Sequence, residues 1–188
     1  MYKKLLFPVL LFASLISYSQ TYTEEIGSSG LPVAGGQIHD VIDYNNDGWE
    51  DVLYNNGNGS LKLYKNTAPG TFTDVTNDVG LGVINMGNNY GVISFDYNND
   101  GFQDILVTRA NNSGAIRLFK NNCGISFVDV SVAAGVSGNL NILGNPKTND
   151  PIILVSDYDK DNDNDLIFTT FNSTTSLYSI SVYINSNG

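Results

Sequence analysis

Apolar residues occur in short runs that alternate with polar clusters along most of the chain. The runs are about five residues long, rich in β-branched and aromatic side chains, and separated by Gly, Asn and Asp, which is typical of short strands joined by turns. No segment shows an apolar stripe of helical spacing and convincing length. The pattern therefore predicts an all-β fold.

The strand pattern repeats. The segment Asp-Tyr-Asn-Asn-Asp-Gly-Trp-Glu-Asp-Val-Leu begins at Asp43, and a close copy begins at Asp96, 53 residues later. A third copy begins at Asp157, after 61 more residues. Each copy is followed by a related strand, which reads Leu63-Tyr64-Lys65-Asn66, Leu118-Phe119-Lys120-Asn121 and Val182-Tyr183-Ile184-Asn185. Internal repeats of this length indicate an array of similar units.

Each unit is predicted to contain four strands. In the second unit we expect them at residues 91–95, 104–108, 115–119 and 126–130. Four antiparallel strands in a unit of roughly 50 residues are typical of one β-propeller blade, and propellers need about four to eight blades. The sequence supplies about three, at residues 20–188. We expect a truncated or partial propeller; the alternative is an assembly that closes the ring between chains.

The N-terminal region matches part of a blade. Thr21-Tyr22-Thr23-Glu24, continuing to Leu31, aligns with residues 71–81 at a constant offset of 50. The match predicts an opening fourth strand without a blade of its own, whereas the third unit stops at Gly188, where its fourth strand should begin. In propellers a first strand commonly completes the last blade. The alternative is an accidental match in a Thr-rich segment.

Residues 1–19 are predicted to be an export signal. Lys3 and Lys4 precede an apolar run to Ile16, and a small-x-small cleavage site follows at residues 17–19. The alternative is a buried N-terminal strand or helix. The mature chain is expected to begin near Gln20, without a membrane span, and to be secreted, on the cell surface or periplasmic.

The chain is acidic, with a net charge of −10 that becomes −12 when the signal and its two lysines are removed. Such a chain repels nucleic acid and anionic membranes. Eleven aspartates fall in three nine-residue segments, where they repel one another unless a cation lies between them. The single cysteine, Cys123, excludes an internal disulfide framework. Bound metal is then the expected substitute for disulfides.

The three acidic loops carry oxygen ligands at spacings that suit Ca²⁺, which takes six to eight oxygens. Side chains at positions one, three, five and nine and the main-chain carbonyl at position seven would bind one ion per loop, about three in all. Position six must turn sharply, as Gly48, Gly101 and Asn162 allow. The predicted ligands are Asp43, Asn45, Asp47, Trp49 and Asp51 in the first loop, Asp96, Asn98, Asp100, Phe102 and Asp104 in the second, and Asp157, Asp159, Asp161, Asp163 and Asp165 in the third.

Two other kinds of loop share part of this pattern. An EF-hand needs a Glu at position twelve and flanking helices, but position twelve is Tyr54, Val107 or Phe168 and the flanks read as strands. A solvated Asx-type turn explains one such loop, since Asp, Asn and Gly favour turns. Three loops in one register favour calcium, and Mg²⁺ fits poorly because it prefers few carboxylates and several waters.

The loop, the following aliphatic strand, Leu63-Tyr64-Lys65-Asn66 and Thr71-Phe72-Thr73-Asp74-Val75-Thr76 together resemble the FG-GAP/VCBS repeats. Such repeats occur in integrin α-chain propellers and in secreted proteins of the cartilage-acidic-protein-like group. The resemblance implies a propeller with calcium in the loops that join strands one and two. It fixes no single activity, since the family includes adhesion modules, lectin-like binders and accessory domains of lyases.

No catalytic group is expected. The only histidine, His39, lies in a predicted strand, no serine has a nucleophile-elbow context, and the paired acids are assigned to metal. The predicted function is extracellular protein recognition, adhesion or scaffolding; alternatives are a carbohydrate-binding accessory module and a calcium-dependent lyase. A protein or glycan ligand would contact the polar loops on the face opposite the calcium loops, at residues 55–60, 83–90, 109–114, 137–151 and 172–176.

Overall fold

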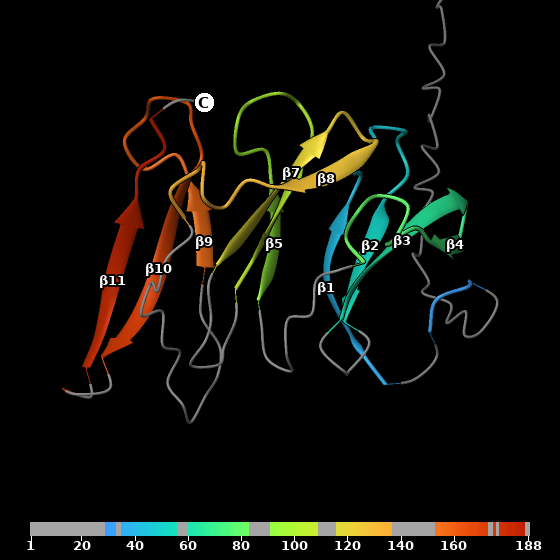
Figure 1. Ribbon diagram of the computed structural model, residues 1–188, viewed down its shortest axis with the longest axis horizontal. Helices are drawn as coiled ribbons and strands as arrows, with labels where there is room; N and C mark the ends of the chain where they lie inside the picture. Colours follow the sequence, from blue (N-terminus) through green and yellow to red (C-terminus); the bar gives the residue numbers. More distant parts are fainter. Residues whose placement is uncertain are drawn as a thin grey trace, which may run out of the picture.

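The computed structural model describes residues 29–32, 35–55, 60–82, 91–108, 116–136, 153–172, 175 and 177–186 (Figure 1). Within these residues the chain is all-β, with eleven strands in three antiparallel sheets. The predicted export signal and the opening strand at residues 21–24 lie outside the described residues, as do most of the predicted recognition loops. No helix long and apolar enough to cross a membrane is found among the described residues.

Each repeat unit forms its own sheet, with strands in sequence order. The first sheet contains β1 (Gln37–Ile42), β2 (Asp51–Asn55), β3 (Leu61–Ala68) and β4 (Thr71–Asp74). The second contains β5 (Val92–Phe95), β6 (Asp104–Val107), β7 (Arg117–Asn122) and β8 (Ser126–Asp129). The third, as described, contains β9 (Ile153–Ser156), β10 (Asp165–Asn172) and β11 (Leu177–Tyr183). The prediction of propeller-like blades is confirmed.

The predicted strands of the second unit agree with β5 to β8 to within a few residues. The third strand was bounded at residues 115–119, although the repeated strand motif reaches Asn121, and β7 runs from Arg117 to Asn122. The last three residues of β7 pair with β8, and Asn121 lies opposite Phe127. The polar residues Lys120 to Asn122 therefore belong to the sheet because main-chain pairing continues beyond the apolar run.

Neighbouring sheets pack face to face and share apolar cores. One core joins the first and second sheets, and contains Ile42, Tyr44, Leu53, Leu61, Leu63, Val79, Leu81, Ile105, Val107, Phe119 and Phe127. The other joins the second and third sheets, and contains Phe95, Leu106, Ile116, Leu118, Val136, Leu166 and Phe168. Because each core takes side chains from two units, a unit depends on its neighbour to bury its apolar face.

The first strands of adjacent sheets are also connected by a charged hydrogen bond. One carboxylate oxygen of Asp40 in β1 accepts from both the main-chain N–H and the hydroxyl of Ser94 in β5, each over 2.7 Å. This contact fixes β1 beside β5 and places the loops that follow these two strands on the same edge of the molecule (Figure 1).

Candidate cation-binding loops

The three predicted loops join β1 to β2, β5 to β6 and β9 to β10, and they lie next to one another on one edge of the molecule (Figure 1). Hydrogen bonds connect them directly. The Asn46 side chain in the first loop donates to the carbonyl of Gly101 in the second over 3.0 Å, and Asn99 donates to the carbonyl of Asn162 in the third over 3.2 Å. The loops therefore form a continuous row.

The aspartate at position nine anchors each loop. Asp51 is fully buried; one carboxylate oxygen accepts from the N–H of Tyr44 over 3.3 Å and the other from the N–H of Asn66 over 2.8 Å. Asp104 and Asp165 are equally buried, and each accepts the two matching bonds. Asp104 accepts from the N–H groups of Tyr97 (2.9 Å) and Asn121 (2.6 Å). Asp165 accepts from those of Tyr158 (2.8 Å) and Asn185 (2.8 Å).

Burial of these anchors makes their negative charge costly. Burial raises the pKa of both Asp51 and Asp104 to about 6, against the opposing effect of the N–H donors. The charges of the other two aspartates in the same loop add to the rise. A nearby cation would favour the ionised form of each carboxyl.

The aspartates at positions one and five shape the turn. Asp43 accepts from the N–H of Asp47 (3.0 Å) and of Gly48 (2.8 Å), and Asp47 accepts from the N–H of Trp49 (3.0 Å). The second loop repeats all three bonds, and the third repeats those made by the N–H groups at positions six and seven. The expected positive φ at position six is present, at 85° for Gly48, 85° for Gly101 and 73° for Asn162.

Sequence reasoning missed that position four also has a left-handed backbone. The φ angle is 53° at Asn46, 56° at Asn99 and 67° at Lys160. Asparagine tolerates this conformation better than most residues, so its presence at position four of two loops was the available signal. The turn points the Asn46 and Asn99 side chains at the next loop rather than into their own.

In the second loop, the asparagine at position three carries a side-chain oxygen with unused bonding capacity. The side-chain nitrogen of Asn98 donates to Asp100 over 2.9 Å, which orients the amide, while its Oδ1 atom is buried without a hydrogen-bond partner. A buried acceptor without a donor is costly. Asn98 is one of the predicted ligands, and a cation bound in the loop would give its Oδ1 atom a partner.

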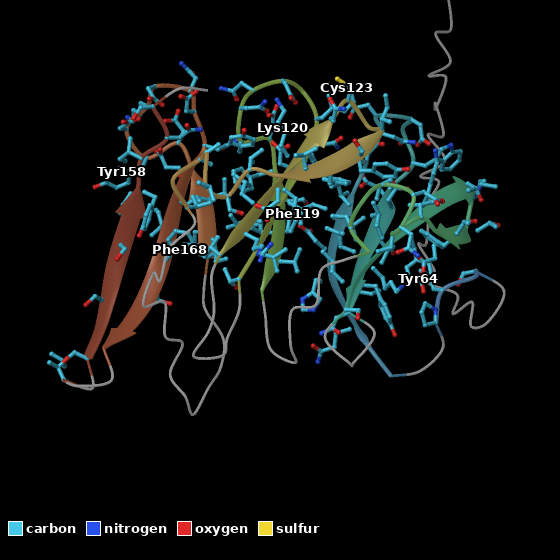
Figure 2. All side chains as sticks on the ribbon, in the orientation of Figure 1. Tyr64, Phe119, Lys120, Cys123, Tyr158 and Phe168 are labelled. Carbon is cyan, nitrogen blue, oxygen red and sulfur yellow. The ribbon has the colours of Figure 1, made fainter. Side chains whose placement is uncertain are left out.

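A lysine contacts the position-five aspartate in the first two loops. The Nζ atom of Lys65 lies 3.0 Å from the carboxylate of Asp47, and that of Lys120 lies 3.3 Å from Asp100. Lys120 lies toward the loop edge of β7 (Figure 2). Hydrogen bonds from Asn45 and Lys65 lower the pKa of Asp47. The third loop has Ile184 at the lysine position, so it lacks this internal cation.

The third loop brings its acids closest together. Carboxylate oxygens of Asp157, Asp159 and Asp165 all lie within 4.8 Å of one another, which no other set of three acids matches among the described residues. Ligands 2.3–2.6 Å from one Ca²⁺ ion are separated by up to about 5 Å. These three side chains fit such an ion. The structure does not gather Asp43, Asp47 and Asp51 in this way, nor Asp96, Asp100 and Asp104.

The remaining predicted ligands of the third loop are engaged in other contacts. Asp161 accepts from the N–H of Asp163 over 3.0 Å, as the position-five residue does in every loop. The side chain of Asp163 accepts from Asn99 of the second loop over 2.8 Å. Position seven is occupied by Trp49, Phe102 and Asp163, and this variety agrees with a main-chain rather than a side-chain ligand there.

Residues 43–107, from the first loop through the second and into β6, match the family model of the FG-GAP-like repeat. The chain contains an FG-GAP-like repeat. The match confirms the resemblance suggested by the loop and strand motifs. No curated protein matches the chain. The matched segment begins just after β1 and covers β2 to β6, together with the first two of the three candidate loops.

Proposed function

We propose that the chain is a secreted calcium-binding repeat module that serves extracellular protein recognition or scaffolding. The observation that carries the proposal is the common register of the three loops, each anchored by a buried aspartate at position nine. Strands and loops of one FG-GAP-like array would be held in fixed relation by the ions, without disulfides.

Electrostatics supports a divalent ion in each loop. Three to five aspartates lie within nine residues, and the lysine contacts in the first two loops offset only one negative charge each. A Ca²⁺ ion in each of three loops would bring the charge of the mature chain from −12 to about −6. The ion would be held by the side chains at positions one, three, five and nine and by the carbonyl at position seven.

Calcium is proposed rather than magnesium because of the ligand set. The loops offer several carboxylates, an amide oxygen and a carbonyl in flexible turns, and such mixed oxygen sites of high coordination suit Ca²⁺. Mg²⁺ demands octahedral geometry at shorter distances and keeps most of its waters. In this proposal the ion supplies charge neutralisation and cross-linking only, and no reaction passes through it.

The proposed recognition role rests on the rigid surface that an ion-stabilised array of blades would present. Rigid sheets with polar connections can present a surface to another protein, since binding residues are commonly carried by loops on a fixed scaffold. An extracellular protein is the proposed partner. A glycan bound in a defined screen, with no protein partner, would instead establish the carbohydrate-binding alternative.

Calorimetric titration with Ca²⁺, together with metal analysis after dialysis, tests the proposed site. About three ions per chain are expected, with much weaker binding of Mg²⁺. Replacing the position-five residues, as Asp47→Ala, Asp100→Ala and Asp161→Ala together, should remove most of the bound calcium. Asp78→Ala, at an exposed aspartate outside the loops, is the matched control. Absence of binding at millimolar Ca²⁺ would refute the calcium proposal.

A further inference from the structure

The three candidate loops are bonded to one another through the residue at position four. The side-chain amide of Asn46 donates to the carbonyl of Gly101, at position six of the second loop, over 3.0 Å. Asn99 repeats this contact, because it donates to the carbonyl of Asn162, at position six of the third loop, over 3.2 Å. It also donates to the carboxylate of Asp163 over 2.8 Å. The same contact therefore occurs at both junctions between loops.

The carbonyl that accepts this bond lies between two predicted ligands of the neighbouring loop. Gly101 follows Asp100, whose carboxylate is a predicted ligand, and precedes Phe102, whose carbonyl is another. The N–H of Gly101 donates to Asp96 of its own loop over 2.8 Å. Its peptide groups are thus held on one side by the second loop and on the other by Asn46 of the first.

The third loop is held in the same way. Asn162 donates its N–H to Asp157 over 3.2 Å, and its carbonyl accepts from Asn99. A further bond runs in the opposite direction, since the Asn164 side chain at position eight donates to the carbonyl of Asp96 in the second loop over 2.8 Å. Each of these two loops therefore fixes part of the other.

Position four serves the neighbouring loop rather than its own. Asn46 and Asn99 have left-handed backbones, which residues other than glycine rarely adopt, with φ of 53° and 56°. Both residues are exposed, and neither is a predicted ligand of its own loop. The unusual backbone directs each amide to the carbonyl in the next loop, which is the contact that the two residues share.

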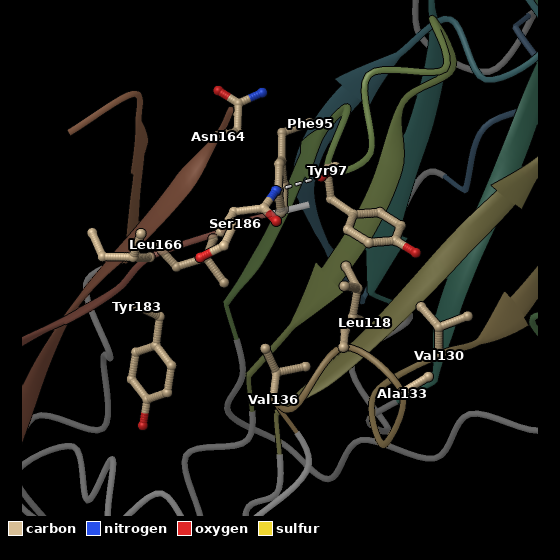
Figure 3. Close-up of a pocket in the computed structure, with 13 residues that line it drawn as sticks. Phe95, Tyr97, Leu118, Val130, Ala133, Val136, Asn164, Leu166, Tyr183 and Ser186 are labelled. Atoms are coloured by element: carbon tan, nitrogen blue, oxygen red, sulfur yellow. Dashed lines mark hydrogen bonds between the residues drawn. The ribbon is translucent and has the colours of Figure 1, made fainter. Parts of the chain in front are cut away.

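Contacts from a strand to a loop differ from these contacts between loops. Asn185, just beyond β11, donates to the carbonyl of Tyr97 in the second loop over 2.7 Å (Figure 3), and Asn121 of β7 makes the same contact with Tyr44. A strand end is held by its sheet whether or not an ion is present. A loop is different, because an ion would overcome the repulsion between its carboxylates and order it. Only bonds between two loops can therefore transmit occupancy.

On the basis of the proposed calcium binding, we infer that the three loops fill cooperatively, and that Asn46 and Asn99 are the positioning residues that transmit occupancy from one loop to the next. A loop ordered by its ion holds its neighbour in place, so the neighbour loses less conformational entropy when it binds its own ion. Such coupling is reciprocal between the two loops. Charge alone acts in the opposite direction, since two divalent ions repel each other. The sign of the coupling distinguishes the two effects.

The third loop should fill first. Three of its carboxylate groups already lie within 4.8 Å of one another, and it has no lysine at the place of the two that contact the other loops. Once filled, it would favour binding to the second loop through Asn99. The second loop would then favour binding to the first through Asn46.

The single tryptophan, Trp49, allows the first loop to be observed separately. It lies at position seven and is 43% exposed, so its emission should change when its carbonyl binds an ion, and the amide resonance of Gly48 gives a second reading of the same loop. Calcium titration of the unmodified chain is compared with that of Asp100→Ala. This change removes a predicted ligand of the second loop but neither of the groups bonded to Gly101. At physiological ionic strength the midpoint for the first loop should move to about threefold to tenfold higher Ca²⁺, the contribution of about one hydrogen bond.

Asn46→Gly tests the transmitting residue. Glycine accepts the left-handed backbone, so the change removes the amide without straining the turn. In this background Asp100→Ala should move the midpoint for the first loop by less than about twofold, as expected when the coupled partner is absent. Asn122→Ala, at an exposed position of β7 outside the loops, is the control and should leave the full shift in place.

Moving the reporter applies the same test to the other junction. Trp49→Phe with Phe102→Trp places the tryptophan at position seven of the second loop, a position that already holds tryptophan in the first. Asp161→Ala, in the third loop, should then raise the midpoint for the second loop. Asn99→Gly should remove most of that rise.

The outcomes separate the coupling from calcium binding itself. A midpoint that is unchanged or lower in Asp100→Ala, or a shift of equal size in the Asn46→Gly background, would overturn the coupling and leave the calcium proposal intact. Absence of both a spectroscopic response and a calorimetric signal at millimolar Ca²⁺ would refute the two together.

Discussion

The side-chain amide of Asn121 donates to the main-chain carbonyl of Tyr44 over 2.7 Å, across the boundary between the first and second sheets. The same amide donates to the carbonyl of Gln103 over 3.0 Å, and the N–H of Asn121 binds the buried anchor Asp104. One buried residue therefore joins the candidate loop of its own sheet to that of the preceding sheet. The loops and the stacking of the sheets are consequently parts of one hydrogen-bonded network.

Replacing this amide should destabilise the stack of sheets. Asn121→Leu keeps the main-chain bond to Asp104 but leaves the carbonyls of Tyr44 and Gln103 without their donor. Each unsatisfied buried group costs about 1–3 kcal/mol, so the free energy of unfolding measured in urea should fall by roughly 2–6 kcal/mol. Asn122→Ala, at the exposed neighbouring position, should change it by less than about 0.5 kcal/mol. Equal effects would show that the amide contacts contribute nothing.

The two lysines should weaken calcium binding to the first two loops. Each ammonium group lies within 3.3 Å of a predicted ligand carboxylate and repels a divalent ion there. Lys65→Met and Lys120→Met together should tighten binding to these loops by roughly threefold to tenfold, most strongly at low ionic strength. Lys62→Met removes a lysine that pairs with Asp74 on β4 and serves as the control. Calorimetric titration would show unchanged affinity if the lysines play no part.

In the third loop, substitutions can distinguish a side-chain ligand from a main-chain ligand. Asp159 contributes a carboxylate to the group of three acids, whereas the side chain of Asp163 binds Asn99 and only its carbonyl is a predicted ligand. Asp159→Ala should lower the calcium affinity of this loop by at least about tenfold, since the number and charge of the ligands set affinity. Asp163→Ala should change it much less. The reverse order would place the ion elsewhere in the loop.

The strands and the loops could be read from the sequence because both depend on local pattern. The apolar runs place β5, β6 and β8 correctly, and the turn residues place Gly48 and Gly101 at positive φ. The constant spacing of oxygen side chains within nine residues predicts a ligand set without knowledge of the fold, and that set stays a prediction. Local pattern was sufficient for the strands and for the turns of the loops.

The contacts between sheets could not be read in this way. Asn121 and Tyr44 are 77 residues apart, and Asn185 and Tyr97 are 88 apart, so no local pattern pairs them. The ion pair of Lys65 with Asp47 depends on how far β3 extends toward the loop, which side-chain periodicity does not reveal. The end of β7 was misplaced for the same reason: pairing with β8, and not its own composition, decides where it stops.

Thermal unfolding with and without calcium tests the central claim most directly. An ion that binds only the folded chain stabilises it by about 2.7 kcal/mol per site at one hundred times its dissociation constant. For a chain of this length the melting temperature should then rise by at least about 5 °C for each occupied loop, and chelator should reverse the rise. The triple variant Asp47→Ala, Asp100→Ala and Asp161→Ala should lose most of the effect, and Mg²⁺ should not replace Ca²⁺. An identical melting temperature in millimolar Ca²⁺ and in chelator would contradict the account.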